Sequence, residues 1–109
     1  RGTKPREFSL IGEYTKVTSW KDLLSKFIIL TFNMDKSIYN EFANSDFSIE
    51  NATRAYITHD NRKLRDGIEI ENSGIYYESN LSANNIVSFI KSIVLKMNLE
   101  LDDLNIYLK

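Results

Sequence analysis

Apolar residues near the start of the chain alternate in part with polar ones and predict a short β-hairpin. Phe8 and Leu10 precede Gly12, and Tyr14 and Val17 follow it. Partial alternation suits strands with one buried face, and a glycine between two such runs suits a turn. The preceding residues, 1–6, are basic and contain Pro and Gly, so we expect a linker there and a domain excised from a longer protein.

Two helices are predicted to follow this hairpin. Ser19-Trp20-Lys21-Asp22 has the form of a capping box, which predicts a helix that begins near Trp20. Its apolar residues extend beyond one face, so we expect the helix to be buried on most sides. These apolar residues are Trp20, Leu23, Leu24, Phe27, Ile28, Ile29, Leu30 and Phe32. Asp35 and Ser37 can cap a second, shorter helix that ends before Asn44.

The second half of the chain combines strand signals with the clearest helix pattern. Residues 54–58 are rich in strand formers, and residues 68–71 and 75–78 read as a hairpin, so a three-stranded antiparallel meander is the simplest arrangement. Ser82 is a good N-cap for a long helix whose apolar face is Ile86, Ile90, Ile93, Val94 and Met97. The alternation of Leu104, Ile106 and Leu108 predicts a C-terminal strand, which must dock on the meander or on the first hairpin.

These elements predict a single α+β domain over residues 7–109. Its predicted order is an N-terminal β-hairpin, two helices, the antiparallel meander, the long helix and the C-terminal strand. We expect Trp20, Leu24, Phe27, Ile90 and Val94 to be buried together, because two amphipathic helices need a common surface on which to hide their apolar faces.

Composition narrows the class of protein. With 42% hydrophobic and 27% charged residues in 109, the chain has the balance of a globular protein, and its longest apolar run, residues 27–30, is far too short to span a membrane. The absence of cysteine excludes disulfides and thiolate metal sites and favours a reducing compartment, so we expect a cytoplasmic protein. A net charge of -1 limits any nucleic-acid site to a local patch.

The sequence contains few residues or motifs that would support catalysis. His59 is the only histidine and lies in a turn-like segment, and neither a nucleophile elbow nor a glycine-rich phosphate loop is present. Paired carboxylates can hold Mg²⁺, and the chain has two clusters of acidic residues. We interpret these clusters as a solvated strand face and a turn. Their members are Glu69, Glu71 and Glu78 in the first and Asp102 and Asp103 in the second. We therefore expect no enzyme, no cofactor and no metal site.

The densest run of cations lies between residues 54 and 66. Four positive residues stand there against Asp60 and Asp66, and strand alternation would place Tyr56 on the same face as Arg54. A basic loop with planar side chains can contact phosphates and stack on bases, and the predicted nucleic-acid-binding residues are Arg54, Tyr56, Arg62, Lys63 and Arg65. The same composition is also typical of a solvated loop, and that alternative stays open.

Structural residues carry a resemblance to a known type of domain. Pro5, Phe8 and Gly12, the segment 19–24 and the segment 74–83 resemble a small uncharacterised domain at the C-terminal end of bacterial and phage proteins, some of them near restriction or defence functions. The resemblance transfers no catalytic residue and implies an accessory role in a nucleic-acid-handling protein.

The predicted function is therefore a non-catalytic accessory binding module of a larger bacterial or phage protein, with a nucleic acid or a protein as partner and no membrane. The alternative is a protein–protein interaction or homodimer domain that pairs through its terminal strand or through the Tyr76/Tyr77 hairpin. A metal-dependent enzyme is the least favoured class.

Overall fold

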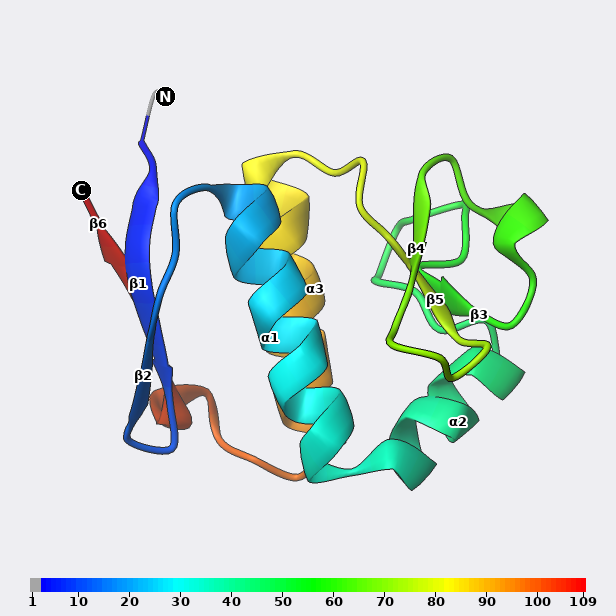
Figure 1. Cartoon of the computed structure of the whole chain (residues 1–109), viewed down its shortest axis with the longest axis horizontal. Helices are drawn as coiled ribbons and strands as arrows, with labels where there is room; N and C mark the ends of the chain where they lie inside the picture. Colours follow the sequence, from blue (N-terminus) through cyan, green and yellow to red (C-terminus); the bar gives the residue numbers. More distant parts are fainter. Residues whose placement is uncertain (1–2) are drawn as a thin grey trace. The chain divides into compact units, whose positions relative to one another are not determined.

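The computed structural model describes residues 3–109, and it confirms the predicted α+β class with three α-helices and two three-stranded antiparallel sheets (Figure 1). Contacts along the chain group into two compact units. Unit 1 comprises Arg1–Phe27 and Ala83–Lys109, and unit 2 comprises Ile28–Ser82. No helix in the part of the chain that the structure describes has the length and apolar character needed to cross a membrane.

Unit 1 contains a sheet in the order β2-β1-β6, with β1 at Pro5–Leu10, β2 at Glu13–Lys16 and β6 at Leu104–Leu108. Ile11 and Gly12, both with positive φ, form the two-residue turn between β1 and β2, as tight hairpins require. The closing strand docks on this hairpin through β1. Because β1 begins at Pro5, Pro5 and Arg6 are not part of a linker, and Arg1 and Gly2 lie outside the described residues.

Local capping explains where the first helix begins and where the last one ends. Helix α1, Trp20–Met34, starts as predicted: the Ser19 hydroxyl accepts a hydrogen bond from Asp22 N at 3.0 Å. The Asp22 carboxylate accepts one from Thr18 N at 2.9 Å, one residue earlier than in a capping box. Helix α3, Ala83–Lys96, follows Ser82 and ends before Asn98, whose φ of 62° is left-handed.

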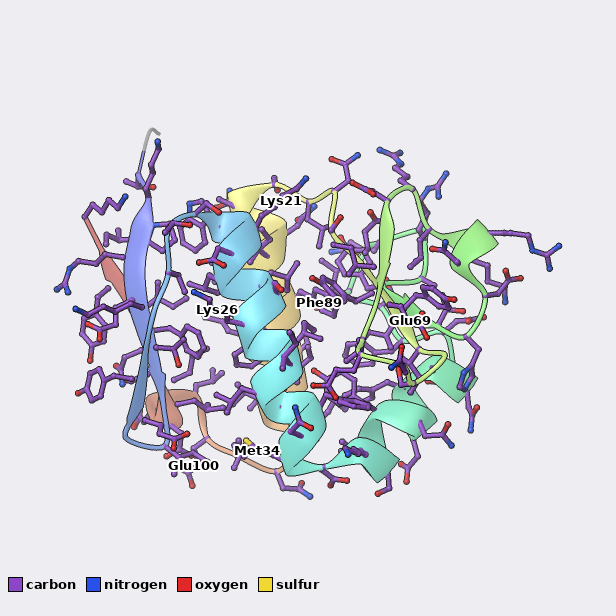
Figure 2. All side chains as sticks on the ribbon, viewed as in Figure 1. Lys21, Lys26, Met34, Glu69, Phe89 and Glu100 are labelled. Carbon is purple, nitrogen blue, oxygen red and sulfur yellow. The ribbon has the colours of Figure 1, made fainter. Side chains whose placement is uncertain are left out.

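The buried face of the sheet in unit 1 carries the aromatic and aliphatic side chains that the pattern predicted. Phe8 packs edge-on against Phe27 of α1 with ring centroids 5.9 Å apart. Lys26 reaches from α1 towards β2 and donates to Lys16 O at 3.1 Å (Figure 2). The other buried apolar residues of this unit are Leu10, Val17, Leu23, Leu24, Ile86, Phe89, Ile90, Ile93, Val94 and Leu104.

Two expectations for α1 are wrong. Ile29 is 40% exposed, so the helix is not buried on most sides. Trp20 is only half-buried, because its indole lies at the first turn and donates Nε1–H to Thr3 O at 3.1 Å rather than entering the core. An indole needs a partner for its N–H, and the backbone just before β1 supplies one.

Unit 2 contains helix α2, Lys36–Asn44, and a second sheet whose strand order corrects the predicted meander. The order is β3-β5-β4, with β3 at Ile57–Thr58, β4 at Gly67–Glu69 and β5 at Tyr76–Glu78, so the last strand is the central one. The predicted strand 54–58 is cut to two residues because Tyr56 N and Ile57 N both donate to Phe47 O. A connection with its own hydrogen bonds, 59–66, separates β3 from β4.

An aromatic cluster forms part of the core of unit 2. The Tyr39 ring lies edge-on to Phe32 and Phe42 at centroid distances of 5.7 and 5.2 Å, and Phe42 also contacts Phe47. The buried Tyr39 hydroxyl is 2.7 Å from the Thr31 hydroxyl, which satisfies it inside the core. Burial raises the pKa of Tyr39, so the phenol stays neutral there.

The packing of unit 1 predicts that replacing its two largest α1 side chains by Ala lowers the unfolding free energy by unequal amounts. Phe27→Ala should destabilise the protein by about 3–5 kcal/mol, because it empties a fully buried site. Trp20→Ala should cost clearly less, since much of the indole already faces solvent. Urea unfolding of both variants checks this, and equal costs would show that Trp20 belongs to the core.

Candidate functional site

Three of the predicted binding residues line one pocket in unit 2. The pocket has a volume of about 560 Å³, and its lining residues are Asp46, Ser48, Ala52, Thr53, Arg54, Ala55, Arg62 and Lys63. We call it the Arg54 pocket. Arg54, Arg62 and Lys63 are all exposed, so their charged ends can meet a ligand from solvent.

Backbone contacts bring these distant residues together. Arg62 and Lys63 lie in the single-turn helix η1, Asn61–Lys63, which starts where the Asp60 carboxylate accepts a hydrogen bond from Arg62 N at 3.0 Å. Arg54 comes from the segment before β3, and its carbonyl accepts a hydrogen bond from the Ser48 hydroxyl at 2.5 Å. Arg54 Nη1 lies 3.5 Å from Lys63 O, at the limit of a hydrogen bond.

Two of the three cations of the pocket are paired with carboxylates. Arg62 makes a two-pronged contact with Asp60 at 3.0 and 3.1 Å, and Lys63 Nζ lies 2.7 Å from Asp46 Oδ2. The other Asp46 oxygen accepts a hydrogen bond from the Thr58 hydroxyl at 2.7 Å. The hydrogen bonds from Lys63 and Thr58 lower the pKa of Asp46, and Arg62 lowers that of Asp60. Both carboxylates are therefore ionised near neutral pH and offset part of the positive charge.

Arg54 has no ion-pair partner within residues 3–109. It is the cation whose charge is least offset at the pocket. Exposed ion pairs are worth little and exchange readily, so an incoming anion can also compete with Asp46 and Asp60 for Lys63 and Arg62.

The structure does not bring all five predicted residues to one surface. Tyr56 is buried, 6% exposed, because the chain at 54–56 is not a strand, so the alternation that was to place it beside Arg54 does not apply. Its ring is not available to stack on a base. Arg65 is exposed but lies outside the pocket lining.

The acidic cluster also differs from the expected solvated face. Glu69 and Glu71 are exposed, but Glu78 is buried, 3% exposed. Its carboxylate accepts three backbone hydrogen bonds, from Arg65 N at 2.8 Å, Asp66 N at 3.1 Å and Asn80 N at 2.9 Å. Residues on both faces of β5 are covered, since Tyr77 is buried as well. Glu78 is thus a structural residue, and neither its role nor that of Asp46 had a signal in the sequence.

His59 and Asp103 make structural contacts, and Asp102 is exposed. His59 Nε2 lies 3.0 Å from Asn44 Oδ1 on the surface. Asp103 accepts a hydrogen bond from Glu100 N at 2.9 Å and caps the single turn η2, Leu101–Asp103. Across residues 3–109, no three His, Asp or Glu side chains are grouped so that they could hold a metal ion.

Replacing Glu78 tests its structural role. Glu78→Gln keeps the shape but turns one acceptor into an NH₂ that faces backbone N–H groups, so unfolding free energy should fall by about 1–3 kcal/mol. Glu69→Gln is the matched control on the same sheet, because Glu69 is exposed and accepts one hydrogen bond within residues 3–109, from Gly74 N. Chemical denaturation of both measures the difference, and a Glu78→Gln protein as stable as the control would contradict the role.

Acid pH should weaken the contact between Asp46 and Lys63. Because the pKa of Asp46 is lowered on folding, its contribution is fully present above about pH 4, the ordinary value for Asp, and is lost as pH falls through the lowered pKa. Asp46→Asn should therefore be less stable than wild type at pH 7, and the difference in unfolding free energy should be smaller at pH 3. Urea unfolding at both pH values checks this, with exposed Asp102→Asn as control; an unchanged gap would refute the assignment.

Comparison of the chain with protein-family models, with curated proteins and with solved structures found no match.

Proposed function

We propose that the chain is a non-catalytic accessory binding module of a larger cytoplasmic protein of bacterial or phage type, and that its Arg54 pocket binds the phosphate backbone of a nucleic acid. The observation that carries this proposal is the meeting of Arg54, Arg62 and Lys63 at one pocket from segments eight residues or more apart. The proposal keeps these three of the five predicted residues.

The chemistry of the pocket suits phosphate. The planar Arg guanidinium offers a fork of N–H donors that matches phosphate oxygens, and Lys supplies a compact charge. Asp46 and Asp60 pair with Lys63 and Arg62, and an incoming phosphate would exchange with these carboxylates. The same carboxylates reduce the net charge of the pocket, so binding should be weak and sensitive to salt.

The pocket favours binding over catalysis. Its lining has the hydroxyls of Ser48 and Thr53 but no histidine to activate them. The Ser48 hydroxyl is already used as a donor to Arg54 O, which makes it part of the support for Arg54.

A second candidate function is self-association through an edge strand. β6 is an edge of the sheet in unit 1, and Leu108 on it is 47% exposed, so it could pair with a second copy. The Tyr76/Tyr77 hairpin supports this less, because β5 has a partner strand on both sides and Tyr77 is buried. Light scattering after size-exclusion chromatography distinguishes a dimer from a monomer.

Binding of a labelled single-stranded oligonucleotide tests the phosphate site. Wild type should bind at low salt, and the three cations of the pocket should contribute about -2 to the log–log salt slope if each displaces ~0.7 counterion. The variant with Arg54, Arg62 and Lys63 all changed to Ala should lose affinity and this share of the slope. Fluorescence anisotropy over a salt series measures both quantities.

A control with the same loss of charge separates the pocket from general electrostatics. Lys21, Lys91 and Lys96 are exposed on α1 and α3, and their joint change to Ala should leave most of the affinity. The proposal fails if wild type binds no oligonucleotide at low salt, or if both triple variants lose affinity equally.

A further inference from the structure

Two tyrosines and an arginine form a row on the sheet of unit 1. The rings of Tyr14 on β2 and Tyr107 on β6 stack with centroids 6.0 Å apart and planes 23° from parallel. The guanidinium carbon of Arg6 lies 5.6 Å from the centroid of the Tyr107 ring. Cation, ring and ring therefore follow one another across three strands.

The strand register places the two tyrosines on the face opposite the core, and Arg6, at the register shift between Pro5 and Glu7, reaches the ring of Tyr107. Ser9 of β1 pairs with Tyr14, and Glu7 pairs with Tyr107, so these side chains share one face, while Phe8 next to them is buried on the other. Within unit 1, α3 and the first half of α1 lie along the side of the sheet that carries Phe8 (Figure 1). The small, buried Ser9 leaves room for the two rings to meet above β1.

Tyr14 leaves a large aromatic surface in water. It is 62% exposed, the highest fraction among the exposed large hydrophobic residues of the described chain. Its ring contacts one other ring within residues 3–109, that of Tyr107, so the far side of Tyr14 is the open end of the row. The neighbouring Tyr107 hydroxyl raises the pKa of Tyr14, which keeps the phenol neutral at physiological pH. A neutral ring with one open side can accept another planar group.

The charges around the row favour an anionic partner. Lys16 pairs with Glu7 in the register and so shares the face of the row. Lys109 follows the last residue of β6 and stays beside the start of β1, because its N–H donates to Lys4 O at 2.8 Å. With Arg6 this makes three cations, whereas Glu7, 3.4 Å from Arg6, is the one acid that the strand pairing within residues 3–109 places on this face. This excess of positive charge stands in a chain whose net charge is -1. Planar groups joined by negative charges are the chemistry of a single-stranded nucleic acid.

We propose that this surface, the tyrosine face (Arg6, Tyr14, Lys16, Tyr107 and Lys109), binds single-stranded nucleic acid by stacking a base on the open side of Tyr14. The three cations contact the phosphates on either side of that base. This inference rests on the proposed function, because both take a nucleic acid as the ligand. The tyrosine face belongs to unit 1, whereas the Arg54 pocket belongs to unit 2. Aromatic rings flanked by cations on a sheet bind single strands with little preference for sequence.

Variants of Tyr14 separate stacking from charge. Tyr14→Ala should weaken binding of a fluorescent oligothymidine by about tenfold or more, the range found for loss of one base–aromatic stack, and should leave the salt slope unchanged. Tyr14→Phe keeps the ring and should retain the affinity. Leu95→Ala, at a residue of α3 that is 54% exposed, is the control for loss of exposed apolar surface. Melting curves confirm that each variant is folded.

The outcomes distinguish this inference from the proposed function. If Tyr14→Ala binds as tightly as wild type while the Arg54/Arg62/Lys63 triple variant does not, the tyrosine face is overturned and the pocket stands. If wild type binds no oligonucleotide, both fail. If wild type forms a dimer that Tyr14→Ala disrupts, and binds no oligonucleotide, the face is an interface between copies and the inference is overturned.

Discussion

The buried carboxylate of Glu78 is the interaction on which the geometry of unit 2 depends. A charge taken out of water is costly unless hydrogen bonds replace its hydration, and here three backbone N–H groups do so. Two of the three come from the connection 59–66 and one from the chain after β5, so a single side chain ties both to the central strand. Ser79 adds to this tie, because its N–H and its hydroxyl both donate to Asp66 O, at 3.0 and 2.8 Å.

Fixing the end of this connection also fixes the turn that carries Arg62 and Lys63. Leu64 follows the turn and is buried, and a Cβ on Gly67 would overlap the side chains of Leu64 and Asn61, so the turn packs directly on the start of β4. Arg62 and Lys63 thus project from a short, closely packed segment rather than from a loose loop. This placement is what a binding site needs, since side chains held on fixed backbone lose less entropy when a ligand arrives.

Features that depend on residues close in sequence, such as the starts of helices, were predicted correctly. Features that depend on the pairing of distant strands were missed. Helices α1 and α3 begin where Ser19 and Ser82 were expected to cap them, because capping and apolar spacing act within a few residues. The order β3-β5-β4 depends on the path of residues 59–66, which no apolar pattern encodes. Tyr56 was misplaced because alternation holds only inside a strand, and Glu78 because acidic residues in strands are mostly exposed. The tyrosine pair joins residues 14 and 107, which only the pairing of β6 with β1 brings together.

The two surfaces would hold a strand by different physics. The Arg54 pocket would attract phosphates through cations, two of which are already paired with Asp46 and Asp60. Salt screens this attraction, which would mainly speed the encounter with the strand and position its backbone. The stack at Tyr14 acts through contact and loss of hydration, and salt screens it little. Neither surface needs a high net charge. A chain with a formal charge of -1 can therefore combine a weak, salt-sensitive phosphate contact with a stacking contact that persists when the charges are screened.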